Sequence, residues 1–221
     1  MNGVSENIQA SAQKSCYKKG NQELEIYDNG VFTYKRNVNK NEEEKKHVKQ
    51  SKSECIKIAS EFLVSNDILP EEFEYYDTGE TIVENLSTNE KNVVTKDIYF
   101  KRKVDGIAVE GDTKIVVSVD GDGLIDSMYS SYREIDKKVK VNNVLSLDDA
   151  IKNIIQWNGE IYVNDDADEV TFDEVEVVYY EQSNPLSENT TIQPVYRITG
   201  KCWNNDKVID DYQGITHAIK N

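Results

Sequence analysis

The stretch LSLDDAIKNIIQW, residues Leu145–Trp157, decides the fold because it predicts a helix that is apolar along one side only. Ser146 can cap the start of this helix, and Asp148 and Asp149 favour the positive end of the helix dipole. The apolar stripe has the three- and four-residue spacing of a buried face and consists of Leu147, Ala150, Ile151, Ile154 and Ile155. Gly159 is suited to end the helix. The segment therefore predicts a short amphipathic helix that covers one face of a sheet.

Three strands are predicted to follow this helix, at Glu174–Glu181, Pro194–Cys202 and Lys207–Ala218. One side of the first strand is mixed, and its other side is apolar and consists of Val175, Val177 and Tyr179. The last two strands are separated by a turn at Asn204–Asp206. Because consecutive strands with short loops favour antiparallel pairing, we expect one helix over an antiparallel meander.

The same plan is predicted once more, earlier in the chain. The helix candidate is Ser53–Asn66, and its apolar stripe consists of Cys55, Ile58, Ala59, Phe62 and Leu63. Asp67 and Pro70 mark its end. Strands are predicted after it at Phe73–Asp77, Glu80–Leu86, Val93–Arg102, Thr113–Val119 and Leu124–Ile135. This region therefore predicts a second antiparallel sheet with one helix.

An N-terminal β-hairpin is predicted before these units. The Asn-Gly pair at residues 29–30 readily adopts the positive φ angles of a type I′ turn, and it separates the strand candidates Gln22–Asp28 and Val31–Arg36. The densest basic patch of the chain, Lys35–Lys52, comes next, but three glutamates interrupt it. We therefore expect Asn37–Gln50 to be a solvated, charged linker rather than a binding arm.

The predicted fold class is α+β, with two tandem units, each of one helix packed on an antiparallel sheet, plus an N-terminal β-hairpin. Residues 1–50 form the hairpin and the charged linker, residues 51–136 the first helix-plus-sheet unit, and residues 137–221 the second unit. No run of about 18 consecutive apolar residues occurs, so no segment of this sequence is predicted to span a membrane.

The charge balance and the motifs argue against several functions. With 26 basic and 41 acidic residues, the net charge of −15 repels nucleic acid and anionic lipid. Neither His47 nor His217 accompanies a nucleophile motif, and glycine-rich phosphate loops are missing from the sequence. The acidic pairs at 165–166, 168–169 and 210–211 are typical of solvated surface rather than of an acid–base pair. We therefore expect no enzyme activity, no catalytic residue and no cofactor.

The sequence also gives little indication of a metal site. Cys16, Cys55 and Cys202 are widely spaced and form no CxxC pair, which disfavours zinc. A Cys16–Cys55 bridge is an alternative to a buried free thiol at Cys55. Asp120–Gly123 lacks a third calcium ligand, and Asn164–Glu169 lacks the glycine of an EF-hand loop. We expect a hairpin turn and an acidic loop there and no metal ligand, with calcium binding at the second string left open.

The second unit resembles a PepSY-type repeat. In that family a helix with a "Thr/Ser, x, acidic, Ala-Ile/Ala" pattern precedes three antiparallel strands, and the middle strand carries a PVY run. The matching residues are LSLDDAIKNI at 145–154, Val175–Tyr180, QPVYRITG at 193–200 and the closing hairpin. In the first unit, Ile98–Arg102, Val104–Ile107 and Lys114–Asp120 resemble the strands of the same module. Two such units, with the tyrosine pair at 179–180, are similar to the YycH/YycI group.

Proteins of the YycH/YycI group are anchored extracytoplasmic regulators that restrain a histidine kinase of Gram-positive bacteria. The resemblance therefore implies a non-enzymatic module that binds a membrane-anchored protein such as a sensor kinase. It also implies a location at the cell membrane, through an N-terminal segment that this chain lacks. The alternative is a protease propeptide or peptidase-inhibitor domain, whose partner is a peptidase. In the tyrosine pairs at 75–76 and 179–180, we expect one ring to pack and the other to face outward.

Overall fold

A computed structural model describes residues 14–28, 30–36, 45–86, 89–132, 134–135, 138, 143–181 and 191–219 of the chain. Within that part the fold is α+β, as predicted, with two helices and mostly antiparallel strand pairs. The described residues divide into two compact units, one of residues 14–102 and 112–134 and one of residues 103–111, 135–181 and 191–219. Neither helix in the described part is long and apolar enough to cross a bilayer.

The sheet of the first unit is antiparallel throughout its described strands. Their order is β1 (Lys14–Lys19), β2 (Gln22–Tyr27), β3 (Phe32–Lys35), β8 (Ile125–Ser130), β7 (Lys114–Asp120), β5 (Glu90–Val104) and β4 (Phe73–Asn85). The predicted hairpin is confirmed as β2 and β3, although Asn29 of its turn lies outside the described residues. Because β3 also pairs with β8, the hairpin continues the sheet of the first unit.

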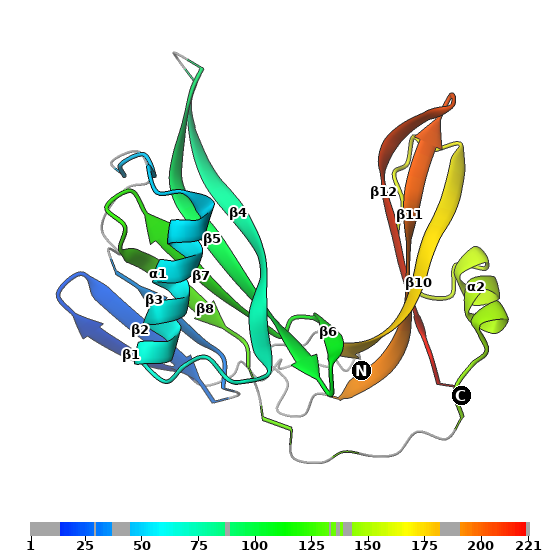
Figure 1. Ribbon diagram of the computed structural model, residues 1–221, viewed down its shortest axis with the longest axis horizontal. Helices are drawn as coiled ribbons and strands as arrows, with labels where there is room; N and C mark the ends of the chain where they lie inside the picture. Colours follow the sequence, from blue (N-terminus) through cyan, green and yellow to red (C-terminus); the bar gives the residue numbers. More distant parts are fainter. Residues whose placement is uncertain are drawn as a thin grey trace, which may run out of the picture. The chain divides into compact units, whose positions relative to one another are not determined.

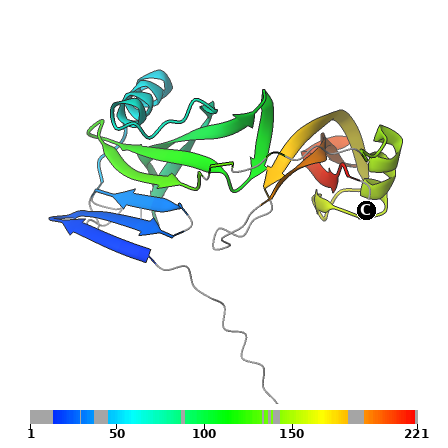
Figure 2. The same cartoon turned by 90° about the horizontal axis from the view of Figure 1, so that it is seen from below.

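The helix of the first unit, α1 (Lys52–Ser65), lies against one face of this sheet (Figures 1 and 2). It begins with a capping box, in which Ser51 Oγ accepts from the Glu54 N–H at 3.3 Å and Glu54 Oε2 accepts from the Ser51 N–H at 2.8 Å. The buried side chains of α1, Cys55, Ala59 and Leu63, pack in one core with Ile115, Val117 and Val119 of β7. The predicted apolar stripe of α1 is therefore confirmed, and it packs against β7.

Three predictions for the first unit need correction. The two strands expected after α1 form the single strand β4, which pairs with β5 through two bulges, one with its extra residue, Tyr76, in β4 and one with its extra residue, Val94, in β5. The strand expected at 124–135 ends at Ser130, because its neighbour β7 begins at Lys114 and offers no further partners. Strand β1 was not predicted at all, because its side chains are exposed on both faces and its residues show no apolar alternation.

The charged segment before α1 is not simply solvated. Its residues 37–44 lie outside the described part, but residues 45–50 run along the first unit's sheet. Val48 is buried, and its N–H donates to the Val93 carbonyl at 2.9 Å. Lys45 pairs with Asp126 at 2.8 Å, and both side chains are almost fully buried. The prediction of a solvated linker is therefore wrong for residues 45–50, because acidic side chains of the β7–β8 hairpin bind its lysines.

The second unit contains one helix, α2 (Leu147–Ile155), and a smaller sheet. Among the described strands the order is β6 (Ile107–Gly111), β10 (Glu169–Glu181), β11 (Ile192–Asn204), β12 (Lys207–His217) and β9 (Glu160–Tyr162). The predicted meander β10–β11–β12 is confirmed as antiparallel. The expectation of purely antiparallel pairing is wrong at one place, because β6 runs parallel to β10 at Tyr179, Tyr180 and Glu181. Strands β6 and β9 were not predicted.

Helix α2 packs on the second unit's sheet (Figure 1), but its predicted stripe is confirmed only in part, since Ala150, Ile151 and Ile154 are buried or half-buried whereas Leu147 and Ile155 are exposed. Ser146 caps it, since its Oγ accepts from the Asp149 N–H at 3.2 Å, and Ile154 packs in one core with Ile198, Cys202 and Tyr212. The helix ends earlier than expected, with Trp157 rather than Gly159 at a positive φ of 61°.

Gly159 instead allows a close approach of the backbone. A Cβ atom on this residue would lie 2.3 Å from the Ile215 carbonyl oxygen of β12. Gly200 of β11 has the same role, since a Cβ there would lie 1.8 Å from the Thr171 carbonyl oxygen of β10. The sheet of the second unit therefore depends on glycine at both positions.

Candidate functional site

The outer side of β10 is the most prominent unpaired backbone of the second unit. Strand β10 pairs with β11 along its length, but β6 covers its other side only from Tyr179 to Glu181. No strand in the described part of the chain pairs with the outer side of residues 169–178. We call these ten residues the β10 edge. Such an edge presents free N–H and C=O groups to which another strand can bind.

The β10 edge is strongly acidic. It contains four acidic residues and no basic one: Glu169, Asp173, Glu174 and Glu176. Glu169 and Glu174 are exposed and have no cationic partner among the described side chains. Asp173 is the extra residue of a bulge between Phe172 and Glu174, which bends the strand. An approaching chain therefore meets a negative potential along this edge.

The fourth acidic residue of the edge belongs to a charge network. Arg197 of β11 lies directly opposite Glu176 of β10, and its Nε donates to Glu176 Oε1 at 3.0 Å. The same guanidinium also pairs with Glu110 of β6, whose side chain is nearly buried. Because one arginine serves two carboxylates, it ties β6, β10 and β11 together. This network holds in place the strand that carries the edge.

Apolar side chains alternate with these acids. Val175 packs with the core under α2, whereas Val177, two residues further on the same side, is 44% exposed. Phe172 is 39% exposed and contacts the ring of Tyr212, with 5.2 Å between the ring centroids. The edge therefore has a carboxylate side and a partly exposed apolar side, a pattern that suits an extended segment with alternating chemistry.

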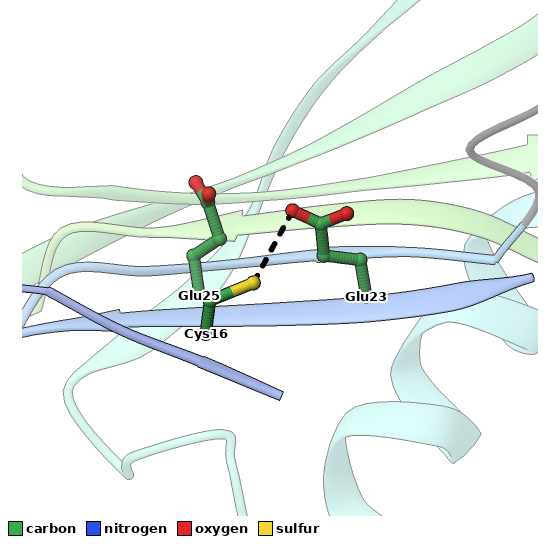
Figure 3. A group of neighbouring side chains, drawn as sticks. All are labelled: Cys16, Glu23 and Glu25. Carbon is green, nitrogen blue, oxygen red and sulfur yellow. Dashed lines mark hydrogen bonds between the residues drawn. The ribbon is translucent and has the colours of Figure 1, made fainter. Parts of the chain in front are cut away.

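A second cluster lies on the hairpin of β1 and β2 (Figure 3). The ligand atoms of Cys16, Glu23 and Glu25 all lie within 4.8 Å of one another, and the Cys16 thiol donates to Glu23 Oε1 at 3.5 Å. Thiolate and carboxylate groups are zinc ligands, so these residues could hold such an ion. Each carboxylate is already bound to a lysine, however: Lys18 lies 3.0 Å from Glu23, and Lys14 pairs with Glu25.

The electrostatics of this cluster keep the thiol protonated. Partial desolvation raises the pKa of Cys16, and the hydrogen bond to Glu23 raises it further. The hydrogen bond that the Lys14 ammonium donates to Glu25 lowers the pKa of that carboxyl. Sequence analysis missed the cluster because Cys16 lies on the unpredicted strand β1. The cross-strand register of Cys16 and Glu25 becomes visible only once β1 and β2 are paired.

The residues considered for acid–base chemistry have structural partners. The hydrogen bond from Asn164 lowers the pKa of Asp210, with further contributions from the Asp211 N–H and Tyr162. A general acid needs a raised carboxyl pKa, so the direction at Asp210 is opposite to what that role requires. The exposed His47 and His217 lie beside the amides of Asn92 and Gln193, respectively.

The two calcium-like strings also hold local backbone. Asp120 Oδ1 accepts from the N–H groups of Asp122 and Leu124, at 3.0 and 3.1 Å, which confirms the predicted turn. In the acidic loop, Asn164 Oδ1 accepts from the Asp166 N–H at 3.0 Å, and Asp168 accepts from the Asn205 N–H at 3.0 Å. These oxygen atoms stabilise turns and a loop contact.

The expected arrangement of the tyrosine pairs holds for one pair. Tyr75 packs at the core of the first unit, and Tyr76 is 58% exposed because it is the extra residue of a bulge in β4. In the second pair, Tyr179 and Tyr180 are both half-buried, and Tyr180 donates to Glu160. The prediction of one outward ring is therefore wrong for the second pair, where β6 covers both residues from the side.

Comparison with known proteins gives only distant likenesses. No family model matches the sequence, and no curated protein matches it. Among solved structures, the Bacillus megaterium YpeB C-terminal domain has 13% identity and a TM-score of 0.46, over 96% of this chain and 87% of that one. An uncharacterized protein from Eubacterium rectale ATCC 33656 has 11% identity and a TM-score of 0.41, over 93% and 72%. Scores this low leave function to be argued from this chain's own residues.

Proposed function

We propose that this chain is a non-enzymatic binding module that acts by association with a protein partner. The observation that carries the proposal is the β10 edge, because an unpaired strand is a ready-made surface for an extended segment of another protein. The hydrogen bonds of Asp210 and of Asp168 in the acidic loop support it, since those carboxylates stabilise local structure. Stoichiometric association, rather than turnover, then produces the effect.

The class of partner follows from the sequence resemblance. The residues that resemble a PepSY-type repeat form α2, β10 and β11, and each compact unit contains one helix and an antiparallel meander. We interpret the two units as tandem versions of one plan, in a module of the YycH/YycI kind. The module lies at the outer face of a cell membrane, held there by a membrane anchor, and its partner is a membrane sensor kinase.

The test mixes the purified chain with the extracytoplasmic domain of the histidine kinase encoded beside its gene. We expect saturable, one-to-one binding by calorimetry. In vesicles that carry the full-length kinase, autophosphorylation should change in proportion to the complex formed. Absence of binding to this domain, or a full effect at a small fraction of one equivalent, contradicts the proposal.

A propeptide or peptidase-inhibitor domain is the alternative, because an exposed extended strand also suits a peptidase. The same titration is therefore repeated with the peptidase encoded nearest to the gene, and residual peptidase activity is measured. A linear loss of activity that ends at one equivalent, without any binding to the kinase domain, favours the alternative.

A further inference from the structure

The chain itself shows that the outer side of β10 accepts a strand. Strand β6 pairs there in parallel register, with Val109 opposite Tyr179 and Gly111 opposite Glu181. Gly111 permits the close approach, since a Cβ on this residue would lie 2.3 Å from the Glu181 carbonyl oxygen. The remaining residues of the β10 edge continue the same side of the same strand. From Glu174 to Val178, between the bulge at Asp173 and the residues that pair with β6, their backbone therefore has the geometry that strand addition needs.

Charge decides which kind of segment fits. A second copy of the β10 edge would place carboxylates opposite carboxylates, and like charges on paired strands are destabilising. The net charge of −15 adds repulsion between copies. Glu169 and Glu174, which have no cationic partner among the described side chains, attract lysine or arginine instead.

The alternation of the strand adds a second requirement. Glu174 and Glu176 share one side of β10, and Val175 and Val177 share the other. An added strand places its own side chains on the same two sides. Its residues should therefore alternate between basic ones, beside the glutamates, and apolar ones, beside the half-exposed Val177.

We propose that the β10 edge binds an extended segment of a partner protein by strand addition, and that this segment alternates basic and apolar residues. The inference rests on the proposed function, because it names the surface and the partner segment of the same association. Main-chain hydrogen bonds provide the affinity, and the acidic side of the edge selects the sign of the partner's charge.

The test measures binding of a capped octapeptide in which lysine and valine alternate. We expect NMR shift changes concentrated at residues 169–178. Glu174→Lys should weaken binding about tenfold, whereas Glu71→Lys, the same change at an exposed turn residue of the first unit, should have little effect. An octapeptide with glutamate in place of lysine should not bind.

N-methylated peptides separate strand addition from simple attraction of charges. A peptide methylated at every valine keeps one complete hydrogen-bonding edge and should still bind, whereas one methylated at every residue has none and should not. Equal binding of the fully methylated peptide, equal losses in Glu174→Lys and Glu71→Lys, or no binding of any peptide overturns the inference. If the kinase domain then binds wild type and Glu174→Lys equally well, only the inference fails. If the kinase domain does not bind either, the proposed function fails too.

Discussion

At the scale of single residues, the three cysteines of the chain lie in different surroundings. The thiols of Cys55 and Cys202 are buried, and that of Cys16 is exposed beside two glutamates. The alternative of a Cys16–Cys55 bridge is not realised, since all three cysteines are free. Reactivity should therefore differ among the three thiols in a way that reports their surroundings.

The first prediction concerns the pH dependence of Cys16 alkylation in the folded protein. Because the thiolate is the reactive form and the pKa of Cys16 is raised, the midpoint of its rate profile should lie above that of a free cysteine. Glu23→Gln removes a negative charge that raises this pKa and leaves only a neutral hydrogen-bond acceptor, so it should move the midpoint down. Mass spectrometry after timed iodoacetamide treatment measures this, with Glu61→Gln as the control. An unchanged or higher midpoint in Glu23→Gln would contradict the assignment.

The second prediction compares two neighbouring residues of α1. Leu63 is 0% exposed in the core of the first unit, whereas Val64 is 66% exposed. Leu63→Ala should lower the free energy of unfolding by about 2–5 kcal/mol, because it removes buried methyl groups and leaves a cavity. Val64→Ala should change it by less than about 0.5 kcal/mol. Urea denaturation followed by circular dichroism measures both, and similar losses would show that the buried face of α1 is misassigned.

At the scale of elements, residues 45–50 form neither helix nor strand, but close contacts hold them against the first unit's sheet. Arg36 pairs with Asp120, and Lys46 pairs with Asp122 at 2.6 Å, on the same β7–β8 turn. Gly121 lies between these acids, and a Cβ on it would lie 2.5 Å from the Lys46 carbonyl oxygen. The turn and the segment are therefore in backbone contact, and the ion pairs surround that contact.

The third prediction follows from this contact. Gly121→Ala should push the segment off the turn and increase the rate of tryptic cleavage after Lys46 in the native protein. Asp122→Asn removes an exposed ion pair, which contributes about 0–1 kcal/mol, and adds no atom at the backbone contact, so it should change the rate much less. Limited proteolysis with mass spectrometry of the products gives both rates. Equal cleavage of Gly121→Ala and wild type would refute the close contact.

The sequence predicted those elements whose signals come from residues close together in the chain. The stripe of α1 and the Asn-Gly hairpin depend on neighbouring residues, and both are confirmed, whereas the stripe of α2 is confirmed at Ala150, Ile151 and Ile154 but not at its two ends. Strand β1 carries no apolar alternation, and β9 is only three residues long, so neither gives a signal. The parallel pair of β6 and β10 joins Val109 to Tyr179, far apart in the sequence, and no local pattern encodes it.

The candidate site was only half visible in the sequence, for the same reason. Strand β10 was predicted from residue 174 onward, because Val175 and Val177 alternate with acids there, but it begins five residues earlier, at Glu169. The bulge at Asp173 breaks the alternation and hides that first part. One side of β10 is uncovered because of the order of the strands in the sheet, and local sequence patterns do not predict that order.

At the scale of the whole molecule, the chain consists of two compact units with different sheet edges. The first unit ends its sheet in β1 on one side and in β4, which has a bulge at Tyr76, on the other. Bulges and charges on an edge strand discourage accidental pairing, and β4 carries both. The β10 edge of the second unit has one bulge and acidic side chains, which admit a basic strand and reject an acidic one.

Residue-resolved amide hydrogen exchange of the free protein, followed by NMR, tests the central claim most directly. In a strand paired on one side only, alternate N–H groups point away from the partner and exchange quickly. We expect fast and slow amides to alternate along residues 169–178, on either side of the bulge at Asp173, and uniformly slow exchange in residues 195–203 of β11, which have strands on both sides. Uniformly slow exchange along residues 169–178 in the monomeric protein would show that the edge is covered, and would contradict the account.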